Sequence, residues 1–402
     1  MANRIYFDHS ATTPLDPRVV AAVELPQGAV FGNPSSLHSE GRQARGLVEE
    51  ARANLAALIG AASSEIVFTA SGTEADNLAL LGVFRSIEKP GHMITSSIEH
   101  PAVMETCRFL EQGGVQVTYL PVDQYGMVDP GDVARALRPD TRLVSVMAAN
   151  NVVGTLQPIA ELARITKEHG ALFHTDAVQS AGKVPLDVSQ VPVDMVSMSA
   201  HKLHGPKGIG ALYVRSRVAL QPVIFGGGQE RGLRSATENV AAIVGFGVAA
   251  RLAAAEMADE AVRLVRLRER LLDGLRAVLP QTYLIGHPFK RLPGHLCLGF
   301  SGREGEAIKL LLSLDEAGVA VSTGSACSAH HASEPSHVLV AMGFDSIRAR
   351  GALRVTLGRF NTEEEVDRFL QIVPQAVESL RPVASYASFA SQGERQCQKS
   401  QK

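Results

Sequence analysis

Cysteine is scarce in this chain of 402 residues, which contains four: Cys107, Cys297, Cys327 and Cys397. Four cysteines are too few to form a disulfide scaffold for a protein of this length, so the sequence fits a reducing compartment. The remaining composition, with 45% hydrophobic and 20% charged residues, is ordinary for a globular protein. A chain of this length is also long enough to bury a large core.

The sequence also lacks an excess of one charge and a long apolar run. Its 39 Lys and Arg residues nearly balance 41 Asp and Glu residues, which leaves a net charge of −2 and no bulk attraction to nucleic acid or membrane. The first residues, MANRIYFDHSATTP, contain no apolar stretch of the signal-peptide type. No run of about 18 apolar residues predicts a transmembrane helix. We therefore expect a cytoplasmic protein without a direct nucleic-acid or membrane partner.

Short apolar runs alternate with helical patterns between about residues 45 and 215. Runs of this length between helices are typical of buried, mostly parallel strands. The expected strands are 65–69, 93–98, 116–122, 142–148, 171–176, 194–200 and 210–214, and the expected helices include 35–60, 74–87 and 159–170. The alternation predicts an α/β fold with a sheet covered on both faces.

The pattern changes after about residue 235. A long helical stretch rich in Ala, Arg and Leu covers about 237–279. Apolar strands near 295–302, 319–323 and 351–358, together with helices near 308–318, 337–343 and 362–380, then indicate a smaller α+β unit. The polar tail from about residue 385 has the composition of a disordered segment.

The first motif with chemical content is Ser71-Gly72-Thr73-Glu74, which follows a predicted strand and opens a predicted helix. Backbone N–H groups at a helix N-terminus form an anion site, and Gly72 allows close approach while Thr73 adds a hydroxyl. Taken alone, the motif fits a simple strand-to-helix turn even better, with Thr73 near the N-cap.

A lysine, Lys202, follows the predicted strand 194–200 within the sequence AHKLHGPKG. A lysine at a strand end can form a Schiff base when its pKa is lowered. A solvated surface lysine is the ordinary alternative, but two histidines, a Gly-Pro pair and a further glycine predict a tight, rigid loop here.

An aspartate, Asp176, lies just past the predicted strand ALFHT. A carboxylate in this place can hold a protonated pyridine nitrogen and keep the ring an electron sink. In isolation, an Asp that caps the next helix is an equally good interpretation.

In order and spacing, these motifs resemble those of the cysteine desulfurases, which belong to the class V aminotransferases and to the fold-type-I pyridoxal phosphate (PLP) enzymes. The resemblance extends from FDHSATTP at residues 7–14 to TLGRFNTEEEVDRFL at residues 356–370. It also covers NPSSLHSEGRQA, FTASGTEADNLA, EHPAV, ANNVVG, HTDAVQSAGK, SAHKLHGPKGIGALYV, GGGQERGLRSATEN and STGSACSAHHASEPSHVL.

The resemblance implies a large PLP-binding domain with a mainly parallel seven-stranded sheet, plus a smaller α+β domain. On this basis we expect residues 1–15 to belong to the small domain and residues 16–260 to form the large one. Residues 261–384 would complete the small domain and carry Cys327, and 385–402 would be the disordered tail.

The resemblance also implies roles for residues that would bind the cofactor. Lys202 would carry PLP as a Schiff base, and Asp176 would pair with its pyridine nitrogen. Gln179 would hydrogen-bond the ring hydroxyl oxygen. The phosphate would be held by Gly72, Thr73, Ser199 and His201, and by Thr237 of a second subunit, which implies a homodimer.

The same resemblance assigns Asn151 and Arg354 to the substrate carboxylate, and a guanidinium suits this role because it binds a carboxylate bidentately. His100 would stack on the cofactor ring and act as an acid–base group. The residues support this separately, because Pro101 favours a helix start and a helix N-terminus disfavours an imidazolium. A half-buried histidine at a helix start is the plainer alternative.

The remaining implied catalytic residue is Cys327, whose thiolate would take sulfur from L-cysteine as a persulfide and leave L-alanine. The surrounding TGSACSAHHASEP is small and polar, which predicts a loop. Cys107 and Cys297 fit buried apolar positions better, and Cys397 in the tail has no assigned role. The persulfide would pass to a protein acceptor, either an iron–sulfur scaffold or a thiolation protein.

The Cys327 loop resembles that of group I of the family, but it departs from the usual pattern. It is one residue longer and carries His330 and His331 where small residues are common. With His337, these residues could make Cys327 a transient metal ligand, although no standard metal motif is present and we expect no resident metal. A milder hypothesis is that they lower the thiol pKa.

A further departure is Val152, which stands where the family usually has an acidic residue. Three other classes of protein stay open: a selenocysteine lyase or aminotransferase of the same fold, a non-catalytic partner protein, and a metal-binding module at the Cys327 loop.

Overall fold

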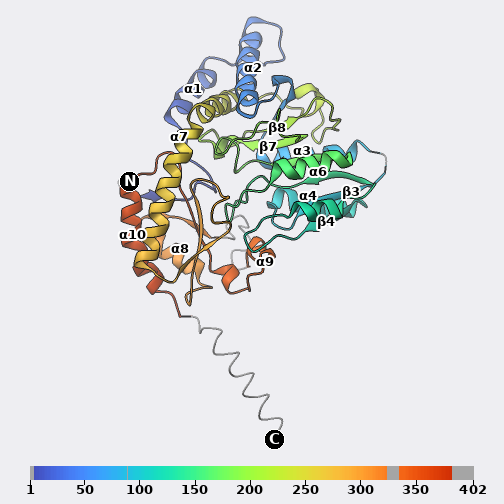
Figure 1. The fold of residues 1–402 in the computed structure, drawn as a ribbon. Coiled ribbons are helices and arrows are strands. Elements are labelled where there is room, and N and C mark those ends of the chain that lie inside the picture. The colour runs from blue at the N-terminus through green and yellow to red at the C-terminus, as the bar shows by residue number, and fades with distance from the viewer. Residues whose placement is uncertain (1–3, 88, 324–334, 383–402) are drawn as a thin grey trace.

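The computed structural model describes residues 4–87, 89–323 and 335–382, and a seven-stranded sheet lies at its centre (Figure 1). The strand order is β2-β8-β7-β6-β5-β3-β4. Strand β8 is antiparallel to both neighbours and the other pairs are parallel. The strands are β2 (Ile66–Thr69), β3 (His92–Ser96), β4 (Gln116–Leu120), β5 (Thr141–Ser145), β6 (Leu172–Asp176), β7 (Met195–Ser199) and β8 (Gly210–Val214). The predicted α/β fold with a mainly parallel sheet is confirmed.

Alternate side chains of these strands enter two different cores, as the two-residue period of a strand requires. In β2, Val67 packs on the side of α3 (Gly72–Arg85) and α4 (Pro101–Gln112). Its neighbours Ile66 and Phe68 enter the other core with α2 (Ser39–Ile59), α5 (Pro130–Ala136) and α6 (Ile159–His169). Helices therefore cover both faces of the sheet.

A second region is built on the four-stranded antiparallel sheet β12-β13-β10-β9 and the two-stranded parallel pair β1-β11. Its core contains Ile5 and Phe7 from the start of the chain together with residues from Leu264 to Leu380. The elements are β1 (Ile5–Tyr6), β9 (Thr282–Ile285), β10 (His295–Phe300), β11 (Val319–Ala320), β12 (Ser322–Thr323), β13 (Leu353–Thr356), α8 (Ala307–Glu316), α9 (His337–Ala341) and α10 (Glu363–Glu378). The domain boundaries expected from the sequence stay a prediction.

Helix α7 (Val240–Val278) joins the two regions (Figure 1). Its first half packs against α1 (Pro17–Gly28) and α2, and its second half packs against α10. By length and composition alone α7 could cross a membrane, but half of its apolar window is buried within the protein. Burial of this kind is typical of a core helix. The first half of α7 contributes to the core of the seven-stranded-sheet region, and its second half contributes to the core of the smaller region.

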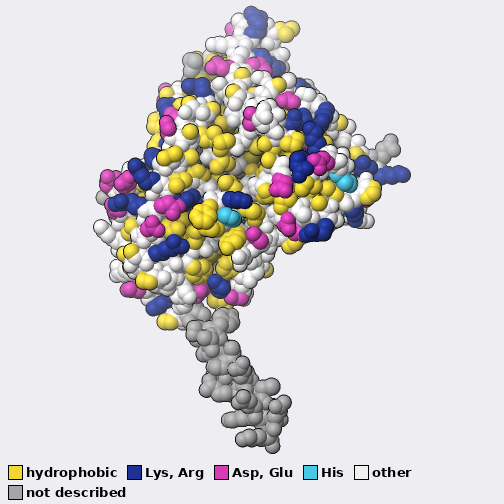
Figure 2. All heavy atoms as spheres, viewed as in Figure 1, with side chains coloured by type: hydrophobic (Ala, Val, Ile, Leu, Met, Phe, Trp, Pro, Cys, Tyr) yellow, Lys and Arg dark blue, Asp and Glu magenta, His cyan; other side chains and the backbone are white. Residues whose placement is uncertain are grey.

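Charged side chains on the face shown in Figure 2 are of both signs and are intermixed. This distribution agrees with the small net charge of −2. The face in view therefore presents no broad field of one sign of the kind that steers a polyanion to a surface.

Candidate active site

A cavity of about 320 Å³ lies where the carboxyl ends of β6 and β7 meet the N-termini of α3 and α4. Ligands of open α/β sheets commonly bind at this edge. The cavity brings together nine of the residues singled out from the sequence, which are Gly72, Thr73, His100, Asn151, Asp176, Gln179, Ser199, His201 and Lys202. Ala11, Ser71, Asp76, Met147 and Val178 complete the lining.

The anion cradle is the N-terminus of α3. Ser71 caps this helix, because its side chain accepts a hydrogen bond from the N–H of Glu74 at 3.1 Å. A Cβ at Gly72 would lie 2.6 Å from Cγ2 of Val178, so any larger residue at the first helical position would displace Val178. The cavity thus meets a helix end whose backbone N–H groups can bind an anion.

The side chain of Lys202 is directed into the site by a 3₁₀ turn, Ala200–Lys202, that follows β7. Lys202 is 8% exposed, and its Nζ donates hydrogen bonds to the main-chain oxygens of Ser10 and Ala11, the latter at 2.7 Å. The neighbouring His201 is held by a hydrogen bond between Nδ1 and Oγ1 of Thr12, and burial lowers its pKa to about 4. His201 is therefore neutral and can donate or accept.

The carboxyl group of Asp176 closes the end of β6. Its Oδ1 accepts a hydrogen bond from the N–H of Val178 at 2.8 Å. Burial raises the pKa of Asp176, whereas His100 and Lys202 act in the opposite direction. A cation at this position would therefore favour the ionised carboxylate.

Sequence reasoning missed a second carboxyl group in the cavity, Asp76. It is 1% exposed, its Oδ1 has no hydrogen-bond partner among the described residues, and Asp176 is nearby. Burial and the neighbouring Asp176 raise the pKa of Asp76 well above its usual range. Two neighbouring buried carboxyl groups do not both ionise readily. Asp76 is therefore expected to stay protonated, and Asp176 is the group that can ionise when a cation is present.

The imidazole of His100 occupies the N-cap of α4, as predicted from Pro101. Its Nδ1 accepts a hydrogen bond from the N–H of Ala102 at 3.1 Å. Because Nδ1 accepts from the backbone, Nε2 is the ring nitrogen available to a substrate.

Three of the predicted site residues do not line the cavity. Arg354 on β13 is buried behind it and donates to the main-chain oxygen of Asn151 at 3.0 Å and to Oδ1 of Asp8 at 2.9 Å. Thr237 is exposed and lies away from this cavity. Cys327 lies outside the described residues, as do His330, His331 and Cys397.

The position of Val152 is apolar in the structure as well. Val152 is 4% exposed and packs in a cluster with Ile98 and Cys297. The amide oxygen of Asn150 accepts from the N–H of Val152 at 2.9 Å. This turn is therefore held through Asn150, and an acidic side chain at residue 152 would be buried among apolar groups.

Both described cysteines are core residues, as the sequence indicated. Cys107 and Cys297 are each 0% exposed and free of disulfides. Burial raises the pKa of both thiols, in Cys297 to about 12. Neither thiol forms a thiolate near neutral pH, so neither can act as a nucleophile. Within the described part of the chain, no group of three His, Cys, Asp or Glu side chains is placed to hold a metal.

The chemistry of the cavity fits pyridoxal phosphate. It offers an amine for the aldehyde in Lys202, a carboxyl group for the ring nitrogen in Asp176 and a helix N-terminus for the phosphate at Gly72. Oε1 of Gln179 is buried without a partner in the described structure, so it can accept a hydrogen bond from the ring hydroxyl. Each polar group of the cofactor has a counterpart.

Comparisons with known proteins point to one family. The family model described as Aminotransferase class-V matches residues 5–369. Cysteine desulfurase IscS 1 of Archaeoglobus fulgidus is 48% identical over 380 residues, which are 94% of this chain and 98% of that protein. Cysteine desulfurase IscS of Dictyoglomus turgidum is 47% identical over 387 residues, covering 96% of this chain and 98% of the relative.

Solved structures agree with the sequence comparisons. A NifS-like protein superposes with a TM-score of 0.88 at 41% identity and covers 94% of this chain and 100% of its own. The structure of SspA in complex with cysteine gives a TM-score of 0.79 at 37% identity, covering 90% and 100%. This chain therefore belongs to the class-V aminotransferase family, and within it to the pyridoxal-phosphate-dependent cysteine desulfurases.

Proposed function

We propose that Lys202, Asp176 and His100 carry the desulfurase reaction in this cavity and that Cys327 receives the sulfur. The observation that carries the proposal is the convergence of an amine, a carboxyl group and an imidazole on one cavity beside a helix N-terminus. When bound, pyridoxal phosphate supplies an electron sink for negative charge on the substrate.

The phosphate end of the cofactor would lie against Gly72, Thr73, Ser199 and His201, which share one end of the cavity lining with the N-terminus of α3. Asp176 would pair with the ring nitrogen, and the resulting cation would offset the burial that raises the pKa of this carboxyl group. Gln179 would accept from the ring hydroxyl.

Two groups would move protons. Lys202 would take the Cα proton of L-cysteine, since its Nζ already lies inside the cavity lining and is held by the carbonyls of Ser10 and Ala11. His100 would hold the proton of the substrate thiol through Nε2, because its Nδ1 is engaged by Ala102.

The thiolate of Cys327 would attack the sulfur of the substrate. A new S–S bond forms as the Cβ–S bond of cysteine breaks, and the electron pair of the broken bond goes to the carbon, which is protonated to give alanine. No external oxidant is needed, because the sulfur leaves as a persulfide. The burial of Cys107 and Cys297 excludes both as the nucleophile, which leaves Cys327 and Cys397 as the candidate thiols.

The substrate carboxylate would be bound by Asn151 and Arg354. Asn151 lines the cavity and Arg354 contacts its main-chain oxygen. Nε of Arg354 is buried without a partner in the described structure, so the guanidinium keeps a donor in reserve. If Arg354 released Asp8 on substrate binding, its guanidinium could form two parallel hydrogen bonds with the carboxylate of L-cysteine.

The quaternary state and the acceptor are finer proposals. We expect a homodimer in which the exposed Thr237 reaches the cofactor phosphate of the second subunit. The same segment is tied to the phosphate helix of its own chain, since Arg234 pairs with Glu74 at 2.8 Å. The names of the IscS relatives favour an iron–sulfur scaffold as the acceptor, with a thiolation protein as the alternative. Cytoplasmic location stays a prediction.

The experiment that tests the roles uses three variants of the holoenzyme incubated with L-cysteine. Lys202→Ala should lose the Schiff-base absorbance and all alanine production. Cys327→Ala should keep that absorbance but lose the mass of one added sulfur atom on the protein. Cys397→Ala is the matched control and should behave as the unmodified enzyme does. If Cys327→Ala produced alanine as fast as the unmodified enzyme, the assignment of Cys327 as the nucleophile would be wrong.

The same assay separates the remaining enzyme classes of this fold. Selenocysteine offered in competition with cysteine would identify a lyase if it is turned over faster and leaves no selenium on the protein. An aminotransferase would convert cysteine without releasing alanine.

A further inference from the structure

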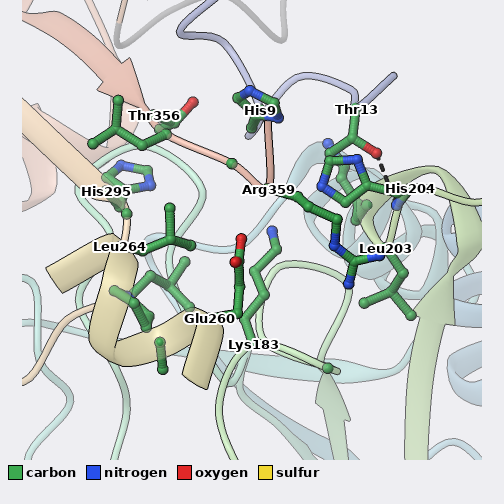
Figure 3. A pocket seen from close by; sticks show the side chains of 18 of the residues that line it. His9, Thr13, Lys183, Leu203, His204, Glu260, Leu264, His295, Thr356 and Arg359 are labelled. Atoms are coloured by element: carbon green, nitrogen blue, oxygen red, sulfur yellow. Dashed lines mark hydrogen bonds between the residues drawn. The ribbon is translucent and has the colours of Figure 1, made fainter. Parts of the chain in front are cut away.

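A second cavity, of about 60 Å³, shares Lys202 and no other lining residue with the active-site cavity (Figure 3). It lies between α7 and the segments that carry His9, Lys183 and His295. The desulfurase reaction as derived above uses no other group in this cavity. Lys183 belongs to the HTDAVQSAGK motif, and the roles assigned to that motif do not include it.

The walls of this cavity combine apolar side chains with a few polar groups. Leu203, Ala253, Leu264 and Leu292 supply apolar surface, and Lys183 and Glu260 extend into the space (Figure 3). A space of about 10–15 Å³ holds one water molecule by the same measure, so this cavity has room for several waters or for a ligand of a few heavy atoms.

Most charges around the cavity are already paired. Arg359 forms ion pairs with Asp16 at 2.6 Å and with Glu256 at 3.2 Å. Glu260 pairs with Arg263 at 3.0 Å. These groups therefore need no ligand.

Two polar side chains are different. No hydrogen bond or ion pair joins the Nζ of Lys183 to any described residue. His9 is 4% exposed, and neither of its ring nitrogens makes a hydrogen bond of good geometry in the described structure, although the main chain of Tyr6 and the side chain of Asn361 lie near enough to raise its pKa. Buried polar groups of folded proteins almost always have partners, so the imidazole of His9 indicates a missing ligand or water. The amine of Lys183, which is half-buried, lines the same cavity and is available to bind that ligand.

Lys183 is also the group of this cavity that titrates near neutral pH. Burial lowers the pKa of its amine to about 7, and Lys202 adds to the effect. Burial lowers the pKa of His9 to about 3, of His201 and His204 to about 4, and of His295 well below its usual range. These four imidazoles stay neutral, while Glu260 and Arg359 are held in ion pairs.

We propose that this cavity binds a small monocarboxylate of about the size of acetate, with its oxygens on Lys183 and His9. One unpaired cation calls for a single negative charge, and the leucine side chains accept a short apolar end. The small volume favours a short acid. A carboxylate also accepts the N–H of a neutral imidazole and the N–H groups of an ammonium together.

The test is calorimetric titration of the holoenzyme with sodium acetate at about pH 8, in two buffers of different ionisation enthalpy and with chloride held constant. At this pH the amine of Lys183, with a pKa of about 7, is mostly neutral. Binding of the carboxylate stabilises the ammonium, so each site takes up close to one proton. We expect one acetate per chain with that proton uptake.

Lys183→Met should weaken acetate binding more than tenfold and remove the proton uptake. Lys167→Met, which changes an exposed lysine of α6, is the matched control and should leave both unchanged. Acetate binding with full proton uptake in Lys183→Met would overturn the proposal.

A second pair of variants leaves every polar group in place. Ala261 lines the cavity from α7, and Ala261→Leu should fill the space and block acetate, whereas the exposed Ala258→Leu should not. This pair also separates the cavity from the carboxylate site proposed at Arg354. If the heat of acetate binding is still observed in both Lys183→Met and Ala261→Leu, acetate binds in the active site and the proposal is wrong.

Discussion

Nε2 of His337 donates a hydrogen bond to the main-chain oxygen of Glu99 at 2.9 Å. Glu99 directly precedes His100, and His337 is the first residue of α9, three residues after the 324–334 segment that carries Cys327. Burial lowers the pKa of His337, so its ring is neutral. This hydrogen bond therefore holds the chain that follows the Cys327 segment against the residue next to His100. Because Nε2 of His337 donates to Glu99, this nitrogen is not available as a metal ligand.

Loss of the hydrogen bond between His337 and Glu99 should slow sulfur transfer to Cys327 without loss of the cofactor. His337→Ala removes one partly buried hydrogen bond, worth roughly 1 kcal/mol, and should lower the rate of persulfide formation by about fivefold. Rapid quenching with mass detection of the added sulfur measures the rate, and cofactor absorbance measures occupancy. His169→Ala, an exposed histidine at the end of α6, is the control. An unchanged rate would show that the hydrogen bond does not position Cys327.

The side chain of Glu99 should make stability depend on pH. Burial raises the pKa of Glu99 to about 8 from 4.5, even though Ser96 and the N–H of Met147 donate to its carboxyl group. The neutral acid is therefore the stable folded form. Its contribution is complete below pH 4.5 and is lost as the pH rises toward 8, at roughly 1 kcal/mol per pH unit.

Glu99→Gln should remove this dependence, because an amide keeps the hydrogen-bonding groups and cannot ionise. We expect the melting temperature of the variant to fall less between about pH 6 and pH 8 than that of the unmodified protein. Glu105→Gln changes an exposed carboxyl group of the adjacent helix α4 and serves as the control. Parallel melting curves for all three proteins would contradict the assignment.

The seven strands of the central sheet and the helix start at Gly72 were predictable because local rules agree with the fold there. Apart from the edge strand β4, the apolar runs of the central sheet are short and largely buried on both faces, so they could be recognised without knowledge of the neighbouring strands. His100 was placed correctly because Pro101 marks a helix start. Two helices were missed although the same signal was present. Helix α5 follows an Asp129 N-cap and Pro130, and α1 begins at Pro17 but contains Pro26.

The missed site residue Asp76 had a weaker signal. It lies on the buried face of α3 with Ala75 and Ala79, so a charged residue interrupts an apolar stripe. No local sequence signal predicted the contact between Arg354 and Asp8, because the two residues are 346 positions apart. Their proximity depends on β1 and β13 reaching the same small region, which no local pattern encodes.

Arg354→Lys should separate substrate binding from cofactor binding. Lysine keeps the charge but loses the planar pair of donors that fits a carboxylate. We expect KM for L-cysteine to rise about tenfold, with a much smaller change in kcat, and cofactor absorbance to be retained. Steady-state alanine production gives both constants. If kcat falls and KM does not, Arg354 supports the fold through Asp8 and does not bind the substrate.

Asp8→Asn is the companion to that variant. It removes the charge that now pairs with the guanidinium but leaves Arg354 itself intact. KM should stay the same or decrease, because Arg354 is then freer to engage the substrate.

The buried pair of Arg52 and Glu230 should be a strong determinant of stability. The two side chains are 3% and 2% exposed, and the guanidinium makes hydrogen bonds of 2.7 and 2.8 Å to the two carboxylate oxygens. Glu230 also accepts from the N–H of Phe68 at 2.8 Å, and it stands at a φ of 48°, followed by Arg231 at 57°. These contacts hold an otherwise unfavourable left-handed backbone in the segment that leads to Thr237.

Glu230→Ala would leave the charge of Arg52 buried and poorly paired, which costs about 3–5 kcal/mol. Glu49→Ala removes the other carboxylate near Arg52, but Glu49 is 48% exposed, so this change should cost less than about 1 kcal/mol. Urea unfolding of the holoenzyme compares the two. If Thr237 reaches the phosphate of a second subunit, Glu230→Ala should also weaken cofactor binding, measured by release of the cofactor on dilution, and Glu49→Ala should not. Equal losses in the two variants would show that burial of the Arg52 pair does not hold this segment.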